Sequence, residues 1–165
     1  MKSYQIAAFG APLVEVEAPT PRPTGKEVLL RVRAAGVCHS DLHVWEGSYD
    51  MGEGKAKMRF EERGIKPPIT LGHETVGEVI AVGDEVVDAV PGQVRLVYPW
   101  IGCDHCNACK RGNYHMCLTP SYTGIQRPGG YADHIMVPDE KFLINIDGID
   151  PVVAAPYACS GITSY

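Results

Sequence analysis

The sequence predicts a mainly β protein, a sandwich or barrel of short strands, and three observations indicate this fold class. Segments in which charged and aliphatic side chains alternate recur along the chain, as strands with one buried face require. Turn residues separate these segments about every 8–12 positions. Eighteen glycines and 13 prolines supply the turns that such a chain of short strands needs.

The predicted strands follow one another from the N-terminus. After the second strand the chain forms a stiff extended link, because Pro19, Pro21 and Pro23 fix φ and have no backbone donor. The alternation is clearest in Glu27–Ala34, which reads EVLLRVRA. The predicted strands span residues 2–9, 13–16, 27–34, 75–82, 94–98 and 131–137.

Two segments depart from this strand pattern. Residues 50–66 combine helix-forming residues with many charges, so we expect an exposed helical insert there. Residues 150–165 begin with Asp150 as an N-cap and Pro151 at the first helical position, which predicts a helix. The sequence stops within this element without a polar tail, so we expect a fragment of a longer protein.

The composition is that of an ordinary globular chain, with 45% hydrophobic and 21% charged residues. A net charge of −5 argues against nucleic acid or an anionic membrane as the main partner. The sequence has no apolar run of about 18 residues, which a transmembrane helix needs, and no signal peptide. We therefore expect a cytoplasmic protein whose six cysteines are metal ligands or catalytic thiols before they are disulfides.

Four cysteines lie close together in the spacing C-x2-C-x2-C-x7-C. Four thiolates at about 2.3 Å complete the tetrahedral shell of a zinc ion and leave no position for substrate, so this pattern predicts a structural zinc loop over residues 102–118. The loop has too little apolar content to fold alone, and metal binding would supply its folding energy. The four cysteines are Cys103, Cys106, Cys109 and Cys117.

The alternatives for this loop are an iron–sulfur cluster, disulfides and free thiols. Bacterial ferredoxins end their motif with a three-residue gap and a proline, whereas here the last gap is seven residues and Leu118 follows. His105 and His115 lie within the loop, but four cysteines already fill the shell of a zinc ion. Zinc is therefore the preferred interpretation.

Cys38, His73 and Cys159 are a second, dispersed candidate set. One histidine and two cysteines are a known ligand set of catalytic zinc, with water or substrate as the fourth ligand. Each residue alone is more often an ordinary core residue. Their spacing along the sequence does not by itself bring them together.

Three further motifs accompany the four-cysteine loop, and together they resemble the zinc-dependent medium-chain alcohol dehydrogenases. Residues 72–86 read G-H-E-x2-G-x5-G-x2-V and match the zinc signature of that family position by position. Residues 38–43, which read CHSDLH, are similar to its first-ligand motif, and residues 159–161, CSG, to its third-ligand turn. The resemblance covers residues 1–165 and implies a GroES-like β-barrel catalytic domain, which a Rossmann domain normally follows.

The resemblance assigns roles to individual residues around the second set. It implies that Cys38, His73 and Cys159 bind the catalytic zinc. Glu74 matches the acidic residue beside the metal. Asp41 matches the carboxylate that orients the zinc-bound histidine through its other ring nitrogen.

The resemblance also implies a proton relay and a cofactor contact. Ser40 matches the hydroxyl that touches the substrate oxygen, and His43 matches the histidine that passes the proton to solvent. His39 matches a position that contacts the cofactor pyrophosphate. The implied reaction oxidises an alcohol, bound to zinc as an alkoxide, to an aldehyde or ketone by hydride transfer to NAD or NADP.

The sequence lacks a dinucleotide fingerprint of the form G-x-G-x-x-G. Gly52 and Gly54 belong to the charged insert, and Lys57 stands at the third glycine position. The Rossmann domain is therefore absent from this chain, and we expect the fragment alone to be inactive. The expected partners are two zinc ions per chain, NAD(P) held by the missing domain, a small alcohol or aldehyde, and further copies of the full-length protein. The alternative is a stand-alone zinc-binding β-barrel without redox turnover.

Overall fold

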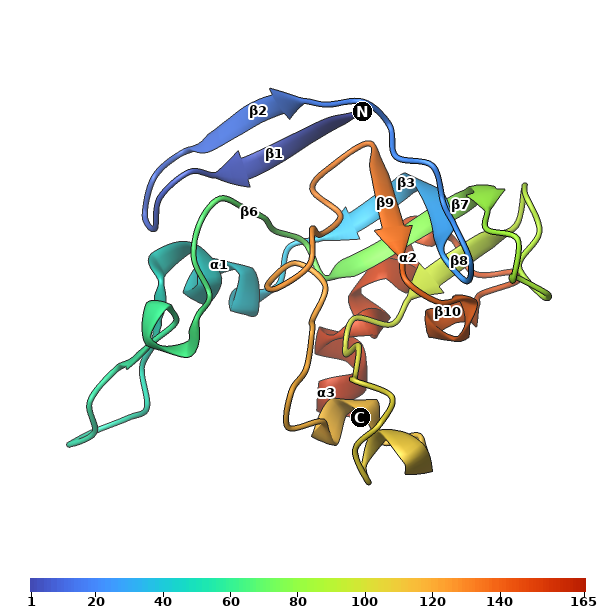
Figure 1. The fold of residues 1–165 in the computed structure, drawn as a ribbon. Helices are drawn as coiled ribbons and strands as arrows, with labels where there is room; N and C mark the ends of the chain where they lie inside the picture. Colours follow the sequence, from blue (N-terminus) through green and yellow to red (C-terminus); the bar gives the residue numbers. More distant parts are fainter.

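The computed structural model describes all 165 residues and consists mainly of short strands (Figure 1). The strands are β1 (Lys2–Ile6), β2 (Leu13–Glu17), β3 (Val28–Gly36), β4 (Ser48–Tyr49), β5 (Met58–Arg59), β6 (Ile69–Thr70), β7 (Glu74–Val82), β8 (Val94–Val97), β9 (His134–Val137) and β10 (Leu143–Asn145). The α-helices are α1 (His39–Glu46), α2 (Pro151–Ala154) and α3 (Ser160–Ser164). The 3₁₀ turns are η1 (Glu61–Arg63), η2 (Cys109–Arg111), η3 (Tyr114–Met116), η4 (Glu140–Phe142) and η5 (Ala155–Ala158).

Three antiparallel sheets make up the fold. The largest has the strand order β10-β8-β7-β3-β9, and a smaller one has the order β2-β1-β6. A bridge between Ser3 and Ala132 joins these two sheets beside β9, and β4 pairs with β5 as a separate two-stranded ribbon. The prediction of a mainly β fold with short helices is confirmed. All six predicted strands are present, with ends that differ by up to three residues.

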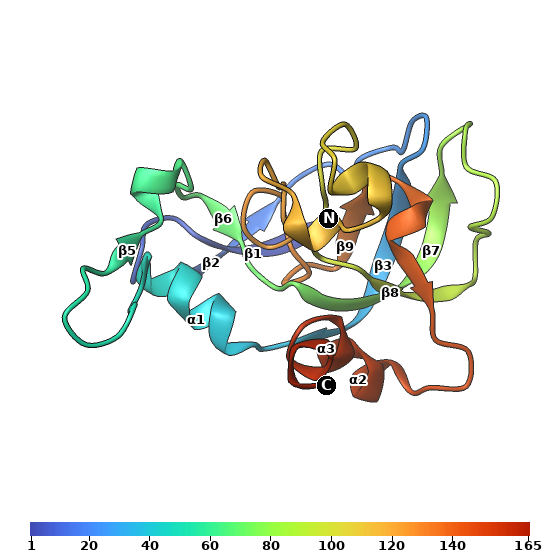
Figure 2. The same cartoon turned by 90° about the horizontal axis from the view of Figure 1, so that it is seen from below.

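The five-stranded sheet has apolar side chains on both faces, and each face has its own core. Val28, Leu30 and Val97 belong to the larger core. Val76 and Leu96 pack on the other side against small alanines of α2 and η5. Figure 2 shows the C-terminal helices on one side of this sheet and the yellow four-cysteine segment on the other. The segment that carries Cys159 and the four-cysteine loop therefore lie on opposite sides of this sheet.

The expectation of a helical insert at residues 50–66 is wrong. The segment contains β5, which pairs with β4, and the single 3₁₀ turn η1, while the rest is turn or irregular backbone. Gly52, Gly54 and Gly64 all have positive φ values, between 76° and 92°. Glycine adopts this conformation readily, and each such residue ends a helical run. The helix propensity of the charged residues between them is not enough to form a helix.

The predicted helix start at Asp150 is confirmed. The Asp150 carboxylate accepts a hydrogen bond from the backbone N–H of Val152 at 2.8 Å, and Pro151 begins α2. The helical segment is not continuous, since Cys159 at the boundary between η5 and α3 has φ −135° and ψ −74°. None of the helices has the length and apolar character needed to span a bilayer.

Phe142 links the larger core to the four-cysteine segment. Phe142 is 2% exposed, and its ring stacks on Tyr98 at 6.5 Å between centroids and meets Tyr114 edge-on at 5.1 Å. We predict that Phe142→Ala lowers the free energy of unfolding by about 3–5 kcal/mol, because it removes a buried ring and leaves a cavity. Denaturant titration measures this, and Leu118→Ala is the control, since Leu118 is 90% exposed. Equal stability of the two variants would contradict the packing role.

Candidate metal centres

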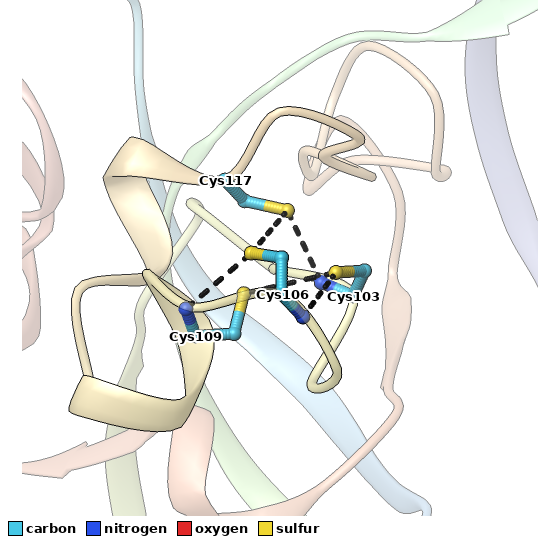
Figure 3. A group of neighbouring side chains, drawn as sticks. All are labelled: Cys103, Cys106, Cys109 and Cys117. Atoms are coloured by element: carbon cyan, nitrogen blue, oxygen red, sulfur yellow. Dashed lines mark hydrogen bonds between the residues drawn. The ribbon is translucent and has the colours of Figure 1, made fainter.

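The four cysteines of the loop 102–118 point their sulfur atoms toward a common centre (Figure 3). Their Sγ atoms all lie within 4.8 Å of one another, and the Cys103–Cys109 and Cys106–Cys117 pairs are 4.0 Å apart. Ligands around a tetrahedral zinc with Zn–S bonds of about 2.3 Å lie about 3.8 Å apart. All six cysteines of the chain are free thiols, so no disulfide closes this loop. The donor set and its spacing fit one zinc ion.

Backbone N–H groups surround this sulfur cluster and favour thiolates. The N–H groups of Cys103 and Cys106 each donate to a cluster sulfur at 3.4 Å. The N–H of His105 lowers the pKa of Cys103 to about 5, whereas burial raises the pKa of Cys109 to about 12. The pKa values of these two thiols thus diverge, as expected for neighbouring thiols whose negative charges repel one another unless a cation lies between them.

The remaining side chains of the loop contact other groups. His105 is exposed, and its Nδ1 lies 2.6 Å from the carbonyl oxygen of Cys103, so it turns toward the backbone. Lys141 Nζ lies 2.7 Å from Asp104 Oδ1, which ties the loop to the barrel next to Phe142. Neither His105 nor His115 belongs to the group of converging ligand atoms.

The pairing of β3 with β7 builds the second cluster. The two strands are antiparallel, and Gly36, at the end of β3, lies opposite Glu74, at the start of β7. Cys38 follows β3 as the N-cap of α1, and His73 immediately precedes β7. These two potential ligands therefore meet at one end of the strand pair. Gly36 permits the close approach, since a Cβ there would lie 2.4 Å from the Glu74 carboxylate.

Cys159 reaches the same place from the C-terminal segment. Its Sγ lies 3.9 Å from that of Cys38, and one ligand atom from each of Cys38, His73, Glu74 and Cys159 lies within 4.8 Å of the others. His73 Nε2 is buried and has no hydrogen-bond partner. An unsatisfied buried nitrogen is unfavourable unless something accepts its lone pair or its proton. A divalent metal at this point would do so, and the donor set suits zinc.

The other ring nitrogen of His73, Nδ1, forms a hydrogen bond with Asp41. Nδ1 lies 3.0 Å from Oδ1 of Asp41, a carboxylate that is 2% exposed. Burial opposes ionisation of Asp41, but the hydrogen bonds from His73 and from the backbone of Cys38 and Gly72 hold its pKa below the usual range. An ionised Asp41 keeps the proton of a neutral imidazole on Nδ1, which leaves the lone pair of Nε2 free for a metal.

The groups around His73 favour a positive charge on its imidazole. Burial lowers the pKa of His73, but the hydrogen bond to Asp41 and the neighbouring Cys159 outweigh it and raise this pKa to about 11. A protonated imidazole carries a hydrogen on Nε2 as well as on Nδ1. A metal that binds Nε2 has to displace the hydrogen there, so metal binding would release a proton.

Glu74 connects the cluster to the segment that carries Cys159. It is 2% exposed, and its Oε1 accepts a hydrogen bond from the backbone N–H of Ser160 at 2.8 Å. This bond holds the turn at Cys159 against the start of β7. A second effect of Glu74 is electrostatic, because a buried carboxylate beside the ligands favours a cation at the centre of the cluster.

The predicted relay residues lie on α1, beside the cluster. Ser40 and His43 are three positions apart and therefore on neighbouring parts of one helix face. The His43 ring lies 4.5 Å from that of His39 and 4.4 Å from that of Tyr49, and its Nδ1 lies 3.8 Å from Glu46. No hydrogen bond joins Ser40 to His43. His39 is exposed, so it is open to a partner.

Sequence reasoning missed Tyr131. Its hydroxyl lies 3.2 Å from Oδ2 of Asp41 and 3.3 Å from the carbonyl oxygen of Gly36. The segment around it reads GGYAD, and its pattern indicates only part of a strand. No periodicity or spacing relates Tyr131 to a residue 90 positions earlier.

The chain is similar to several known proteins. Residues 24–148 match the family model described as the alcohol dehydrogenase GroES-like domain. The NAD-dependent alcohol dehydrogenase of Sulfurisphaera tokodaii is 40% identical over all 165 residues, which cover 46% of its length. The crystal structure of the alcohol dehydrogenase from the archaeon Aeropyrum pernix superposes with a TM-score of 0.84 at 30% identity, over 100% of this chain and 46% of that one.

A third relative has been solved with metal bound. The cobalt- and zinc-bound thermostable alcohol dehydrogenase from Pyrobaculum aerophilum is similar with a TM-score of 0.75 at 31% identity, over 98% of this chain and 46% of that one. The present chain thus spans about half the length of the relatives it matches.

We predict that Cys106→Ser removes one zinc ion per chain and lowers the melting temperature by about 10 °C or more. The loop depends on its metal for folding energy, and a loss of a few kcal/mol corresponds to a shift of this size. Elemental mass spectrometry and thermal melting measure the two effects. His115→Asn is the matched control within the same loop and should change neither. An unchanged melting curve for Cys106→Ser would contradict a structural metal.

Proposed function

Because this chain belongs to the zinc-type medium-chain alcohol dehydrogenase family, as its GroES-like N-terminal domain, we propose that it provides the metal site at which an alcohol is oxidised by hydride transfer to NAD(P). The product is an aldehyde or ketone. The observation that supports this most directly is the convergence of Cys38, His73 and Cys159 around the unpartnered Nε2 of His73. Three protein ligands are the set of a catalytic zinc, which keeps a position for substrate.

Zinc bound there would act as a Lewis acid that lowers the pKa of an alcohol hydroxyl and stabilises negative charge on its oxygen. The chain's own residues prepare that chemistry. Asp41 fixes the tautomer and the orientation of His73 through Nδ1. Glu74 holds the turn that presents Cys159, and its buried charge favours the cation.

A proton must leave when an alcohol is oxidised, and we assign its path to Ser40 and His43. A serine hydroxyl both accepts and donates a hydrogen bond. A histidine changes charge near neutral pH and can pass a proton to solvent. The two lie on one face of α1, and His43 is 19% exposed, at the boundary between the interior and water.

The remaining proposals concern the whole protein. The loop 102–118 would hold a second, structural zinc, which gives two zinc ions per chain. NAD or NADP would bind mainly to the half of the relatives that this chain does not span, with His39 contacting the cofactor from α1. The full-length protein would be a homo-oligomer that acts on a small alcohol or aldehyde, and its net negative charge disfavours nucleic acid as a partner.

We predict that the purified chain binds two zinc ions and that His73→Ala binds one. His73→Ala should lower turnover of the enzyme that contains this domain by more than about 100-fold, because even outer partners of a ligand cost 10–100-fold. Elemental mass spectrometry and steady-state kinetics test both statements. His134→Ala is the control, since His134 Nδ1 lies 2.8 Å from Asp133, its backbone pairs with Arg31 of β3, and it is not among the converging ligand residues. Undiminished turnover of His73→Ala would refute the catalytic assignment.

We further predict that His43→Gln slows turnover most at low pH. Without the imidazole the proton must pass to solvent directly, and hydroxide replaces the lost base only as the pH rises. The pH profile of kcat measures this, with His105→Gln as the control. The same profile in wild type and His43→Gln would exclude the relay. A domain that holds both zinc ions and supports no turnover in the longer protein would favour a stand-alone zinc-binding barrel.

A further inference from the structure

We propose that Tyr131 is a positioning residue for the mixed Cys–His–Cys site: its phenol fixes Asp41, and Asp41 in turn fixes His73. This inference rests on the proposed function, because it assigns a role to Tyr131 within that same site. It concerns the chain's own hydrogen bonds. It is therefore testable by metal affinity without any turnover.

The Asp41 carboxylate accepts four hydrogen bonds next to the mixed site. Oδ1 accepts hydrogen bonds from His73 Nδ1 and from the backbone N–H of Gly72, both at 3.0 Å. Oδ2 accepts hydrogen bonds from the N–H of Cys38 at 3.1 Å and from the hydroxyl of Tyr131 at 3.2 Å. Two of these donors belong to potential ligands, and a third is the neighbour of His73. Tyr131 is the one side chain that restrains Asp41 and is not itself part of the ligand segments.

Tyr131 is held by hydrogen bonds of its backbone and by close packing of its ring. Its N–H donates to the carbonyl oxygen of Leu71 at 3.0 Å, and its carbonyl oxygen accepts from Tyr4 of β1 at 2.8 Å. Its ring lies so close to Gly72 that a Cβ on Gly72 would be 2.6 Å from the ring. The phenol is therefore fixed relative to the segment that carries His73, and a hydrogen bond from a fixed donor limits rotation of the carboxylate it reaches.

The Tyr131 hydroxyl has to be protonated to donate a hydrogen bond to Asp41. Burial and the negative charge of Asp41 raise the pKa of Tyr131 well above its usual value, so the hydroxyl stays protonated and remains a donor. Its hydrogen reaches either Asp41 Oδ2 or the carbonyl oxygen of Gly36, and the charged acceptor forms the stronger bond.

The surroundings offer no substitute for the phenol. Tyr131 and Asp41 line a groove of about 340 Å³ whose other side chains are apolar. The one side-chain donor among them, the indole N–H of Trp45, already donates to the carbonyl oxygen of Ala11 at 2.7 Å. Loss of the Tyr131 hydroxyl would leave Oδ2 with the Cys38 N–H as its single protein donor. The other groove residues are Leu13, Val37, Leu42 and Leu71.

The experiment is a titration of the metal-free purified chain with Co²⁺ in competition with a chelator. Cobalt absorbs differently in the four-cysteine site and in the mixed Cys–His–Cys site, so one spectrum reports both affinities. We expect Tyr131→Phe to weaken the mixed site by about 10-fold, the lower end of the range for a lost outer partner. The four-cysteine site should bind as in wild type, and an unchanged melting curve shows that the variant is folded. Tyr4→Phe is the control, because its exposed hydroxyl donates to Glu15 at 2.9 Å.

A double variant tests whether Tyr131 acts through Asp41. If it does, Tyr131→Phe combined with Asp41→Asn should weaken the mixed site no more than Asp41→Asn alone. Additive losses, or equal weakening of both cobalt sites by Tyr131→Phe, would overturn the proposal. So would two cobalt ions bound to Tyr131→Phe as tightly as to wild type, in which case the proposed function still stands. A wild-type chain that binds one cobalt ion, at the four-cysteine site alone, would overturn the proposed function and this inference together.

Discussion

The antiparallel pairing of β3 with β7 is the constraint on which the interior and the mixed metal site both depend. These strands lie side by side within the large sheet. Cys38 follows the end of β3, and His73 precedes the start of β7 at the same edge of the pair. A slip of one residue would turn every side chain of a strand to the opposite face. It would exchange buried valines such as Val76 and Val79 with their neighbours and would separate the two potential ligands. Packing of the two cores therefore fixes the register that the site needs, at a place several residues away from the metal.

The two metal-ligand groups represent opposite ways to assemble a site. The four cysteines lie within one short loop, and the loop has little apolar support of its own apart from Tyr114 against Phe142. A metal there would bring order to a segment that is otherwise held by few contacts. The residues of the mixed group come from a strand, a helix cap and the C-terminal segment, and hydrogen bonds to the carboxylates of Asp41 and Glu74 arrange them. A metal at the four-cysteine site would stabilise the loop around it, whereas the surrounding fold holds the ligands of the mixed site in place.

This difference explains what the sequence can and cannot predict. Strands with regular alternation and the clustered cysteines depend on local pattern, and the structure has both. The composition of the insert at 50–66 predicts a helix wrongly, because three glycines with positive φ values decide its backbone. The convergence of Cys159 with Cys38, 121 positions apart, follows from family resemblance alone. The strand pattern at residues 131–137 does not mark Tyr131 as a site residue, since its contact with Asp41 arises only when β1 and the segment before β7 are packed together.

The position of Cys159 between η5 and α3 has a consequence for how the mixed site would retain its ion. Two donors belong to the barrel, and the third is delivered by a segment that docks through small alanines and through the bond from Ser160 to Glu74. The third thiolate is then present at a high effective concentration only while that segment is docked. Opening of the segment would convert a three-donor chelate into a two-donor one. The dissociation rate of the ion would thus depend on how often α2, η5 and α3 separate from the sheet.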